Sequence, residues 1–437
     1  MTTIPPSLAA FVRDHRHENP QQLALAARRF PDVDMPAAIR QIEGWQTART
    51  KLPTLAANDD IVYPTRLSME QCSSELTATY KQLLAASLRK RWQKETEELK
   101  PFCLTDLTGG FGVDTLFLAR AFDHATYVER NETLCHIAQH NFDLLCRGHI
   151  DVLCSDAEAH LQDMEHTAVI FADPARRDAR GGRTFAIADC TPDICALLPL
   201  LRQKARWTLV KLSPMLDWHK AVADLRQVEQ VHIVAVDGEC KELLLLIDSK
   251  QPPTNAPTVT CADLSRKLLP DNAPAVTCAD LSQKTLPQVI TFSPEETEMT
   301  MMDTQTPVKG HFLYEPHAAI MKSGCFAALC RRFALKAVAQ DSHLFVAETP
   351  ISNFPGRAFV VDDVATMNKR ELKAFLTDSQ QAPIRQANVA VRHFPLTAAE
   401  LQRRLKVADG GNHYIFGTTT HNGTHLLLRC HKNTTPT

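Results

Sequence analysis

The sequence predicts an α/β protein with a doubly wound, mostly parallel sheet, a helical region before the sheet and an α+β region after it. Three observations support this fold class. Residues 1–100 have helical periodicity, short β-like runs alternate with helical segments from about residue 101, and a mixed pattern resumes after residue 306. Because a chain of 437 residues is too long for one ordinary core, we expect two or more domains.

The first hundred residues have the spacing of amphipathic helices. Apolar residues recur at i, i+3 and i+4 in three stretches that begin at polar residues or prolines, namely SLAAFVRDH (7–15), NPQQLALAARRF (19–30) and DMPAAIRQIEGWQTART (34–50). A fourth stretch, residues 63–87, is typical of a turn followed by a longer helix with a serine cap. We therefore expect an N-terminal helical region over residues 1–100.

The central region is marked by short apolar runs that we interpret as strands. They are FCLTD (102–106), ATYVE (125–129), IDVLC (150–154), AVIFA (168–172), WTLVK (207–211), VHIVAV (231–236) and ELLLLI (242–247). Helical segments lie between most of them, which favours a parallel sheet over residues 101–250. The last two runs are joined by DGECK, which has no room for a crossover helix, so the last strand is expected to be antiparallel to its neighbour.

A tandem repeat follows this region. NAPTVTCADLSRKLLPD (255–271) and NAPAVTCADLSQKTLPQ (272–288) agree at 13 of 17 positions, and prolines precede the first copy. Two copies are too few for a solenoid, which needs at least about three. We therefore interpret residues 251–290 as a connector that tolerates duplication, and we assign no chemistry to it.

The region after residue 306 again mixes strand-like and helical segments. Its apolar runs are HLFVAE (343–348), AFVVDD (358–363), ANVAVRHF (387–394), YIFGT (414–418) and HLLLRC (425–430). The pattern predicts two small α+β parts, over residues 291–355 and 356–437.

Charge is divided unevenly along the chain. The net charge is −2, but residues 306–437 hold 16 Lys and Arg against 9 Asp and Glu, a formal +7, which leaves −9 for the remainder. A basic C-terminal third in an otherwise acidic chain favours a protein surface that binds a polyanion. A chance division of surface charge would give the same counts.

Several classes of protein are excluded by composition. The sequence contains no apolar run long enough to span a membrane, and its start lacks the pattern of a signal peptide. The 13 cysteines are scattered without a CxxC pair or a metal-like Cys/His spacing. We therefore expect a cytoplasmic protein with reduced cysteines, no metal site and no membrane partner.

The most informative local pattern is LTDLTGGFGVDTLFLARAF (104–122). It predicts a strand that ends at Asp106, a glycine turn, and a helix that begins near Val113, so that backbone N–H groups can approach a ligand closely. Two cofactor classes use this geometry. A dinucleotide site requires a third glycine after Gly110 and Gly112, but position 115 is threonine.

An acid instead precedes the glycines. Asp106, Thr108, Gly109, Gly110 and Gly112 together resemble motif I of the class I S-adenosylmethionine (SAM)-dependent methyltransferases. This resemblance implies a Rossmann-like methyltransferase sheet in which these residues bind SAM.

The same resemblance assigns roles to acids at later strand ends. It implies that Glu129, in YVERNE, accepts hydrogen bonds from the ribose hydroxyls and that Asp156, in LCSDAE, receives the adenine amino group. Ser74, in the SSELT segment before the sheet, matches a cofactor-contacting segment of nucleic-acid amino-methyltransferases. A helix-capping role explains Ser74 equally well.

The stretch DPARRDARGGRTF (173–185) follows the fourth predicted strand. Asp173 and Pro174 resemble the start of the DPP(Y/F/W) loops of enzymes that methylate exocyclic amines of bases, which implies a catalytic role for both residues. This sequence departs from that pattern with Ala175 and Arg176 in place of the second proline and the aromatic residue. A guanidinium group can stack on a base or pair with phosphate, so Arg176 and Arg177 are the candidates to contact the substrate.

Two further observations concern this edge of the sheet. Lys211 is the last residue of the fifth predicted strand, WTLVK, and Ser213 and Asp217 follow it in VKLSPMLD. Lys211 is a candidate substrate-binding residue. Cys190 and Cys195 lie well beyond the acid–proline turn in the sequence, so we do not expect a cysteine nucleophile of the kind used in carbon-5 pyrimidine methylation.

The chain as a whole resembles a family of bacterial methyltransferases, common in the Bacteroidetes, with a ferredoxin-like part and a THUMP-like C-terminal domain. The stretches that carry the resemblance are LSMEQCSSELTATYK, DLTGGFGVDT, DPARRDARGGRTF, VKLSPMLD, GECKELLLL, FLYEPHAAIMKSGCF, NFPGRAF, VRHFP and DGGNHYIF. The resemblance implies a ferredoxin-like subdomain over residues 291–355 and a THUMP-like domain over residues 356–437. THUMP-type domains imply that the partner is an RNA, either rRNA or tRNA.

These observations lead to a functional prediction with alternatives. The leading one is a SAM-dependent methyltransferase for an exocyclic amine in structured RNA. Guanine N2 is favoured because motif I and YVERNE are similar to those of small-subunit rRNA guanine-N2 methyltransferases. The altered acid–proline loop leaves open an RNA-binding scaffold that holds SAM without transferring methyl. An NAD-type oxidoreductase is disfavoured by the missing third glycine.

Overall fold

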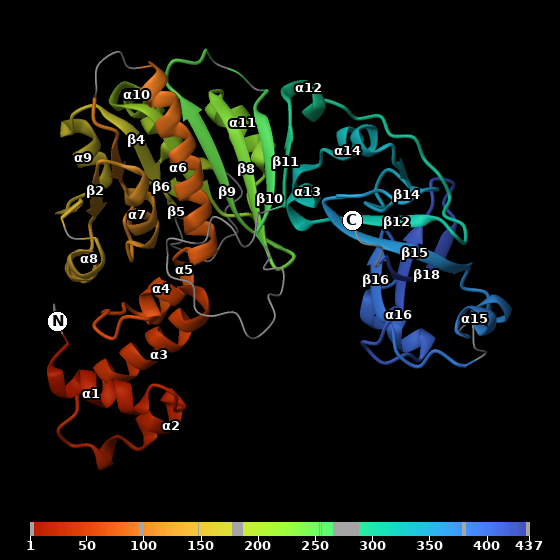
Figure 1. Ribbon diagram of the computed structural model, residues 1–437, viewed down its shortest axis with the longest axis horizontal. Coiled ribbons are helices and arrows are strands. Elements are labelled where there is room, and N and C mark those ends of the chain that lie inside the picture. The colour runs from red at the N-terminus through yellow and green to blue at the C-terminus, as the bar shows by residue number, and fades with distance from the viewer. Residues whose placement is uncertain are drawn as a thin grey trace. The chain divides into compact units, whose positions relative to one another are not determined.

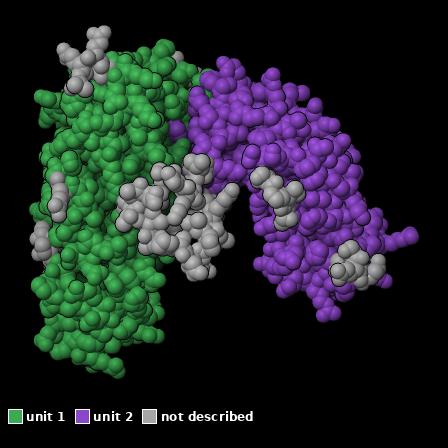
Figure 2. All heavy atoms as spheres, viewed as in Figure 1, with its two compact units in different colours: residues 1–231, 241–257, 268–286 green, residues 232–240, 258–267, 287–437 purple. Residues whose placement is uncertain are grey.

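The computed structural model describes residues 4–95, 100–146, 148–176, 187–252, 254, 256–264, 288–377 and 382–433. The chain forms two compact units (Figure 2). The first comprises residues 1–231, 241–257 and 268–286, and the second comprises residues 232–240, 258–267 and 287–437.

The first unit begins with the predicted helical region. Its helices are α1 (Pro6–His15), α2 (Pro20–Leu25), α3 (Met35–Lys51), α4 (Pro53–Ala56), α5 (Arg66–Gln71) and α6 (Glu75–Glu95). Side chains cap α2 and α3 at the start, since Asn19 accepts hydrogen bonds from the backbone N–H groups of Gln21 and Gln22, and Asp34 accepts one from Ala37. The apolar faces of α1, α2 and α3 bury Leu8, Leu23 and Ile42 in a common cluster.

The sheet of this unit contains β1 (Cys103–Asp106), β2 (His124–Glu129), β3 (Ile150–Cys154), β4 (Thr167–Ala172), β7 (Ala205–Leu212) and β9 (Glu239–Asp248). Their order is β3-β2-β1-β4-β7-β9. Figure 1 labels β2, β4 and β9 of this sheet. Adjacent strands are parallel except for β9, which is antiparallel to β7. Strands β4 and β7 are buried along their whole length, as expected for strands covered on both faces.

Helices connect the strands in doubly wound fashion. They are α7 (Val113–Leu118), α8 (Glu132–Leu145), α9 (Ala157–Asp163), α10 (Ile194–Lys204) and α11 (Trp218–Leu225). The chain runs outward from β1 to β2 and β3 on one side and through β4 and β7 on the other. The boundary between β1 and β4 is therefore the switch point, at which ligands bind in sheets of this type.

The second unit contains a strand within the segment that we interpreted as a connector. This strand, β10 (Thr258–Asp263), lies in the first copy of the repeat and pairs antiparallel with β11 (Gln288–Phe292). Its four central residues, Val259 to Ala262, are all buried. The second copy, apart from its last residue, lies outside the described residues. Strand β8 (Val228–Val236), which precedes β9 in the chain, is divided between the units.

The remainder of the second unit is built on one sheet, with the order β13-β14-β12-β15-β18-β17-β16. These strands are β12 (Phe312–Pro316), β13 (Lys336–Ala337), β14 (Phe345–Ala347), β15 (Gly356–Ala365), β16 (Asn388–Arg392), β17 (Tyr414–Thr419) and β18 (His425–Lys432). The antiparallel pairing of β12 with β15 joins the two parts that the sequence divides near residue 355 into this single sheet.

The second unit also contains short helices. They are α12 (Pro294–Thr297), α13 (Ala318–Ser323), α14 (Phe326–Phe333), α15 (Lys369–Phe375) and α16 (Ala398–Leu405). Phe375 of α15 and Leu401 of α16 pack in one cluster with Ile415 and Leu427 of the sheet, whereas Phe416 belongs to a separate cluster on the opposite face. Helices α15 and α16 therefore cover the same face of this sheet.

Candidate active site

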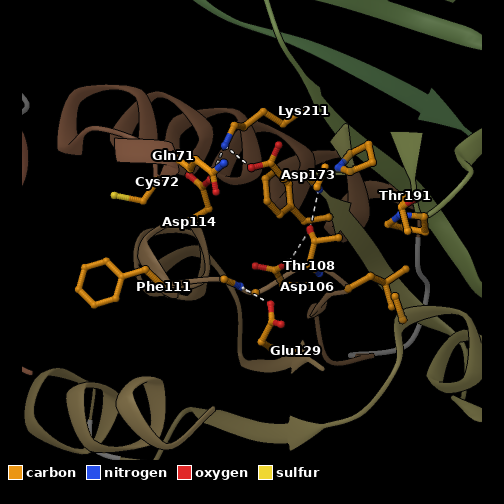
Figure 3. Close-up of a pocket in the computed structure, with 18 of the residues that line it drawn as sticks. Gln71, Cys72, Asp106, Thr108, Phe111, Asp114, Glu129, Asp173, Thr191 and Lys211 are labelled. Atoms are coloured by element: carbon orange, nitrogen blue, oxygen red, sulfur yellow. Dashed lines mark hydrogen bonds and ion pairs between the residues drawn. The ribbon is translucent and has the colours of Figure 1, made fainter. Parts of the chain in front are cut away.

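A cavity of about 740 Å³ opens at the carboxyl ends of the central strands of the first unit (Figure 3). It is lined by the loop between β1 and α7, by the ends of β2, β3, β4 and β7, and by residues that precede α6. The predicted site residues in its lining are Asp106, Thr108, Gly109, Gly110, Gly112, Glu129, Asp156, Asp173, Pro174 and Lys211. The strand ends bring these residues together as the switch-point argument predicts.

The buried carboxylate of Asp106 fixes the glycine loop. Its Oδ1 accepts a hydrogen bond from the backbone N–H of Thr108 at 2.9 Å, and its Oδ2 accepts one from Oγ1 of Thr115 at 2.6 Å. Burial raises the pKa of Asp106 to about 7, although both hydrogen bonds oppose this shift. Asp106 thus ties the end of β1 to the loop and to α7.

This pKa has a testable consequence for stability. In the folded state Asp106 stays protonated up to about pH 7, whereas in the unfolded chain it ionises near pH 3.8. The folded state therefore binds more protons between these values, and this carboxyl makes the protein less stable as the pH rises. The free energy of unfolding of the wild-type protein should fall by about 2 kcal/mol more than that of Asp106→Asn between pH 5 and pH 7. Urea unfolding at both pH values measures this difference, and parallel pH dependences would contradict it.

The glycines let the loop pack closely on its surroundings. A Cβ atom on Gly109 would lie 2.1 Å from the ring of Tyr127 on β2, and one on Gly112 would lie 2.7 Å from the ring of Phe142 on α8. Gly110 differs, because a Cβ atom there would meet only the carbonyl oxygen of Thr108, at 3.9 Å. Gly109 and Gly112 are thus required for packing, whereas Gly110 leaves space open in the lining of the cavity.

Glu129, at the end of β2, is hydrogen-bonded to the same glycine loop. Its Oε2 accepts a hydrogen bond from the backbone N–H of Gly110 at 3.0 Å, and its Oε1 accepts one from Asn131 at 2.9 Å. Each carboxylate oxygen can accept a second hydrogen bond. The arrangement therefore presents two acceptors, held in place by the backbone, to the cavity.

Asp156 has a structural role in addition to its place in the cavity lining. It is the N-cap residue of α9, and its Oδ1 accepts hydrogen bonds from the backbone N–H groups of Glu158 and Ala159. Its Oδ2 takes no part in this cap. Asp156 thus adds an acceptor to the part of the lining that follows β3.

The acid–proline turn is tied to the glycine loop. The backbone N–H of Asp173 donates a hydrogen bond to Oγ1 of Thr108 at 2.6 Å, so that the ends of β1 and β4 are joined at the switch point. The Asp173 carboxylate forms an ion pair with Nζ of Lys211. Figure 3 shows the side chains of Asp173, Lys211 and Asp114 pointing toward one another, on a different side of the cavity from Glu129.

Lys211 is held by several acids in a buried site. Its Nζ also donates hydrogen bonds to Oγ of Ser73 at 3.2 Å and to Oδ2 of Asp114 at 3.4 Å. Burial by itself would lower the pKa of Lys211, but the carboxylates of Asp173, Asp114 and Glu242 raise it above its ordinary value. The ammonium group is therefore charged at neutral pH.

The turn continues into a short antiparallel ribbon, in which β5 (Ala175–Arg176) pairs with β6 (Cys190–Thr191). This pairing corrects one inference from the sequence. Cys190 is distant from the acid–proline turn in the sequence, but its backbone lies opposite Arg176 and the residue lines the cavity, together with Thr191 and Pro192. The side chain of Arg176 and the whole of Arg177 lie outside the described residues.

Ser74 occupies a different place from the one that its predicted role requires. Its Oγ accepts a hydrogen bond from the backbone N–H of Thr77 at the start of α6, and Ser74 is not among the described residues that line the cavity. The preceding residues Gln71, Cys72 and Ser73 do line it. Because Ser74 caps the start of α6 and is not among the described residues that line the cavity, the capping interpretation fits this position.

Sequence reasoning did not identify Lys81 or Asp114 among the groups that surround Lys211 and Asp173. Lys81 and Glu242 are buried behind the cavity, Asp114 is buried in its lining, and Lys81 forms ion pairs with both acids. One signal was available, because Asp114 is an acid in the first turn of α7, two residues after Gly112. In the described parts of the chain, no group of three or more His, Cys, Asp or Glu side chains could hold a metal ion. Nor does a described helix have the length and hydropathy needed to cross a membrane.

Comparisons with known proteins place this site in a family. Models of a ferredoxin-like domain and of a THUMP domain-like family match residues 312–355 and 356–432. A search of curated proteins found no match. The solved structure of a "putative methyltransferase" from Porphyromonas gingivalis W83 is similar at 30% identity, with a TM-score of 0.79, over 98% of this chain and 97% of that chain.

Two other solved structures are similar over a smaller part. A SAM-dependent methyltransferase from Agrobacterium tumefaciens is 18% identical over 39% of this chain and 62% of that chain, with a TM-score of 0.29. A 16S rRNA N2 G1207 methyltransferase from T. thermophilus, solved with AdoMet and guanosine, is 16% identical over 38% and 42%, with a TM-score of 0.27. The similarity to the Porphyromonas protein, in contrast, extends over nearly the whole of both molecules, and the chain therefore belongs to this family of bacterial methyltransferases with ferredoxin-like and THUMP-like C-terminal domains.

Proposed function

We propose that this protein transfers a methyl group from SAM to an exocyclic amine of a base in structured RNA, rRNA or tRNA, with guanine N2 as the favoured atom. The observation that carries the proposal is the carboxylate of Asp173. It follows β4 directly, it is held by Lys211, and it lines the same cavity as the glycine loop and Glu129.

The residues of the cavity fit SAM. Gly110 leaves space in the lining, and Glu129 is fixed by two backbone N–H groups with acceptor capacity left for two ribose hydroxyls. Oδ2 of Asp156, which the helix cap does not use, is suited to the adenine amino group. Acidic residues, among them Asp114, Glu129 and Asp173, outnumber lysines around the cavity, which favours a ligand with a positively charged sulfur.

The chemistry then depends on how Asp173 presents the substrate. SAM, when bound, supplies an electrophilic methyl group on a sulfonium. We assign to Asp173 the acceptance of a hydrogen bond from the substrate amine, which orients the nitrogen for attack. Because the carboxylate of Asp173 is paired with the charged ammonium group of Lys211, we assign it the role of hydrogen-bond acceptor and not that of base. The proton that the nitrogen loses on methylation is therefore expected to leave to water.

The transfer reaction is tested with methyl-labelled SAM and total RNA from a strain that lacks the gene. The proposal expects label in RNA. If the protein binds SAM in calorimetry but labels no RNA, the enzymatic proposal fails and the alternative of an RNA-binding scaffold gains support. A preference for NAD over SAM in the same calorimetry would contradict both.

The RNA partner is supported by basic residues on the second unit. Helices α15 and α16, which cover one face of their sheet, carry six exposed cations, namely Lys369, Arg370, Lys373, Arg403, Arg404 and Lys406. The acids of these helices are occupied, since Glu371 accepts hydrogen bonds from Thr366 and Glu400 accepts them from Thr397. We propose that this helical face contacts RNA phosphates.

Charge reversal tests this face. The triple variant Arg403→Glu, Arg404→Glu, Lys406→Glu is expected to weaken RNA binding and to reduce the slope of log K against log salt by about one for each lost phosphate contact. The matched control is Arg28→Glu, Arg29→Glu, which reverses two exposed arginines of the helical region. Filter binding at several salt concentrations measures both slopes. An unchanged slope in the triple variant would exclude this face as the RNA contact.

A further inference from the structure

The cavity rests on a buried group of charges that extends well beyond its lining. Lys81, in the middle of α6, is 0% exposed, and its Nζ lies 2.7 Å from both Oε atoms of Glu242 on β9, which is 3% exposed. The same Nζ lies 3.1 Å from Oδ1 of Asp114. Neither Lys81 nor Glu242 is among the described residues that line the cavity.

Ser73 joins this buried pair to Lys211. Its Oγ donates a hydrogen bond to Oδ2 of Asp114 at 2.8 Å and accepts hydrogen bonds from Nζ of Lys81 and of Lys211, each at 3.2 Å. The two ammonium groups therefore share one hydroxyl and one carboxylate. The partner that Lys211 alone contacts is Asp173.

The charges in this group do not balance. Three carboxylates, those of Asp114, Asp173 and Glu242, face the two ammonium groups of Lys81 and Lys211. Lys81 pairs with both Glu242 and Asp114 and offsets one of these two buried charges, so that Lys211 remains available to Asp173. Without Lys81, two buried carboxylates would compete for Lys211, and an unpaired buried charge is strongly unfavourable. The side chain of Asp173 is 36% exposed, so water can solvate it and it would lose this competition.

We propose that Lys81 and Glu242 are positioning residues for methyl transfer: by pairing with each other they leave Lys211 on Asp173, and so fix the carboxylate at which the substrate amine binds. This inference rests on the proposed role of Asp173. This positioning role would explain why the pair is buried, because a buried ion pair contributes little net stability compared with apolar residues of similar size.

The test compares single and double variants by labelling of RNA at saturating SAM. Lys81→Met is expected to lower kcat about 10- to 100-fold with little change in the KM for SAM. The double variant Lys81→Met, Glu242→Met also removes one of the two buried carboxylates that compete for Lys211, which leaves Lys211 with Asp114 and Asp173, its two carboxylate partners in the wild type, and should recover part of the lost kcat. A merely structural role predicts instead that kcat per folded molecule is unchanged in Lys81→Met, or that the double variant is no faster than the single one.

A control variant keeps stability separate from positioning. Arg91, also on α6, forms an ion pair with Asp248 of the same strand β9 at 3.1 Å, and neither residue lines the cavity. Arg91→Met should lower the melting temperature but leave kcat within about two-fold of wild type. A loss of kcat as large as that of Lys81→Met would overturn the inference, because it would show that any loosened contact between α6 and β9 impairs transfer.

A structural readout does not depend on activity. In a crystal structure of Lys81→Met, Nζ of Lys211 is expected to have turned from Asp173 toward Asp114 and Glu242, and in the double variant it should again contact both Asp114 and Asp173, as in the wild type. If Lys211 still contacts Asp173 in the single variant, the inference is wrong, whatever the fate of the proposed function. If wild-type protein labels no RNA while Lys211 moves as expected, the proposed function fails and the positioning of Asp173 by this pair stands.

Discussion

Replacing Asp173 by alanine is expected to abolish methyl transfer almost completely, with kcat lowered about 100- to 1000-fold. The carboxylate is the acceptor that we assign to the substrate amine, and no other acid follows β4 at this edge of the sheet before the described residues end at Arg176. SAM affinity should stay within a few-fold of wild type, because the glycine loop and Glu129 do not depend on this side chain. Label incorporation and calorimetry measure the two effects.

Asp173→Asn is the matched variant. The amide keeps an oxygen acceptor of the same shape and can still receive a hydrogen bond from Lys211, so transfer should remain within about ten-fold of wild type. If Asp173 acted as a strong base, the asparagine variant would be as inactive as the alanine variant. A large loss of SAM binding in Asp173→Ala would also refute its assigned role.

The second large effect is expected at Gly110, where alanine should lower the affinity for SAM at least about 100-fold. A Cβ atom there meets no protein atom closer than 3.9 Å, so the methyl group fits the protein but takes up space in the cavity lining. Its backbone φ of +54° lies in the left-handed region, which costs a non-glycine residue about 1–2 kcal/mol. The melting temperature should therefore fall only slightly, while calorimetry detects little or no binding.

In Gly109→Ala, the loss of stability is expected to be the larger effect. Its Cβ atom would lie 2.1 Å from the ring of Tyr127, so the substitution should reduce the stability of the protein much more than Gly110→Ala does. Equal SAM affinities of Gly110→Ala and wild-type protein would mean that this loop does not contact the cofactor.

Much of the first unit could be predicted from its sequence because parallel strands are buried on both faces. Runs such as AVIFA and WTLVK stand out as continuous apolar segments, and the structure places β4 and β7 there. Strand β12 was missed because FLYEP contains a glutamate, which is buried and paired with Arg357 and Arg392. A buried ion pair of this kind has no signal in local periodicity.

The cavity lining could be predicted for a related reason. Asp106, Glu129 and Asp173 each end or follow a parallel strand, and the carboxyl ends of such strands meet at one edge of the sheet. Lys211 near the end of β7 follows the same rule. Sequence order was therefore enough to bring these side chains to one cavity.

The support beneath that cavity could not be predicted, because it depends on packing between distant segments. Lys81 and Glu242 are 161 residues apart in the chain and meet only because α6 packs against β9. Cys190 reaches the cavity through the β5–β6 ribbon, which returns the chain to the acid–proline turn. The position of Ser74 depends on where α6 begins, and a shift of one residue brings Ser73 to the cavity instead.

The central claim is that this methyltransferase modifies an exocyclic amine in RNA. Its most direct test is mass spectrometry of the nucleosides of purified rRNA and tRNA from strains with and without the gene. The proposal predicts that one N-methylated base, with N2-methylguanosine as the leading candidate, is lost from one RNA class and restored by the wild-type gene but not by Asp173→Ala. Identical nucleoside profiles in the two strains would contradict it.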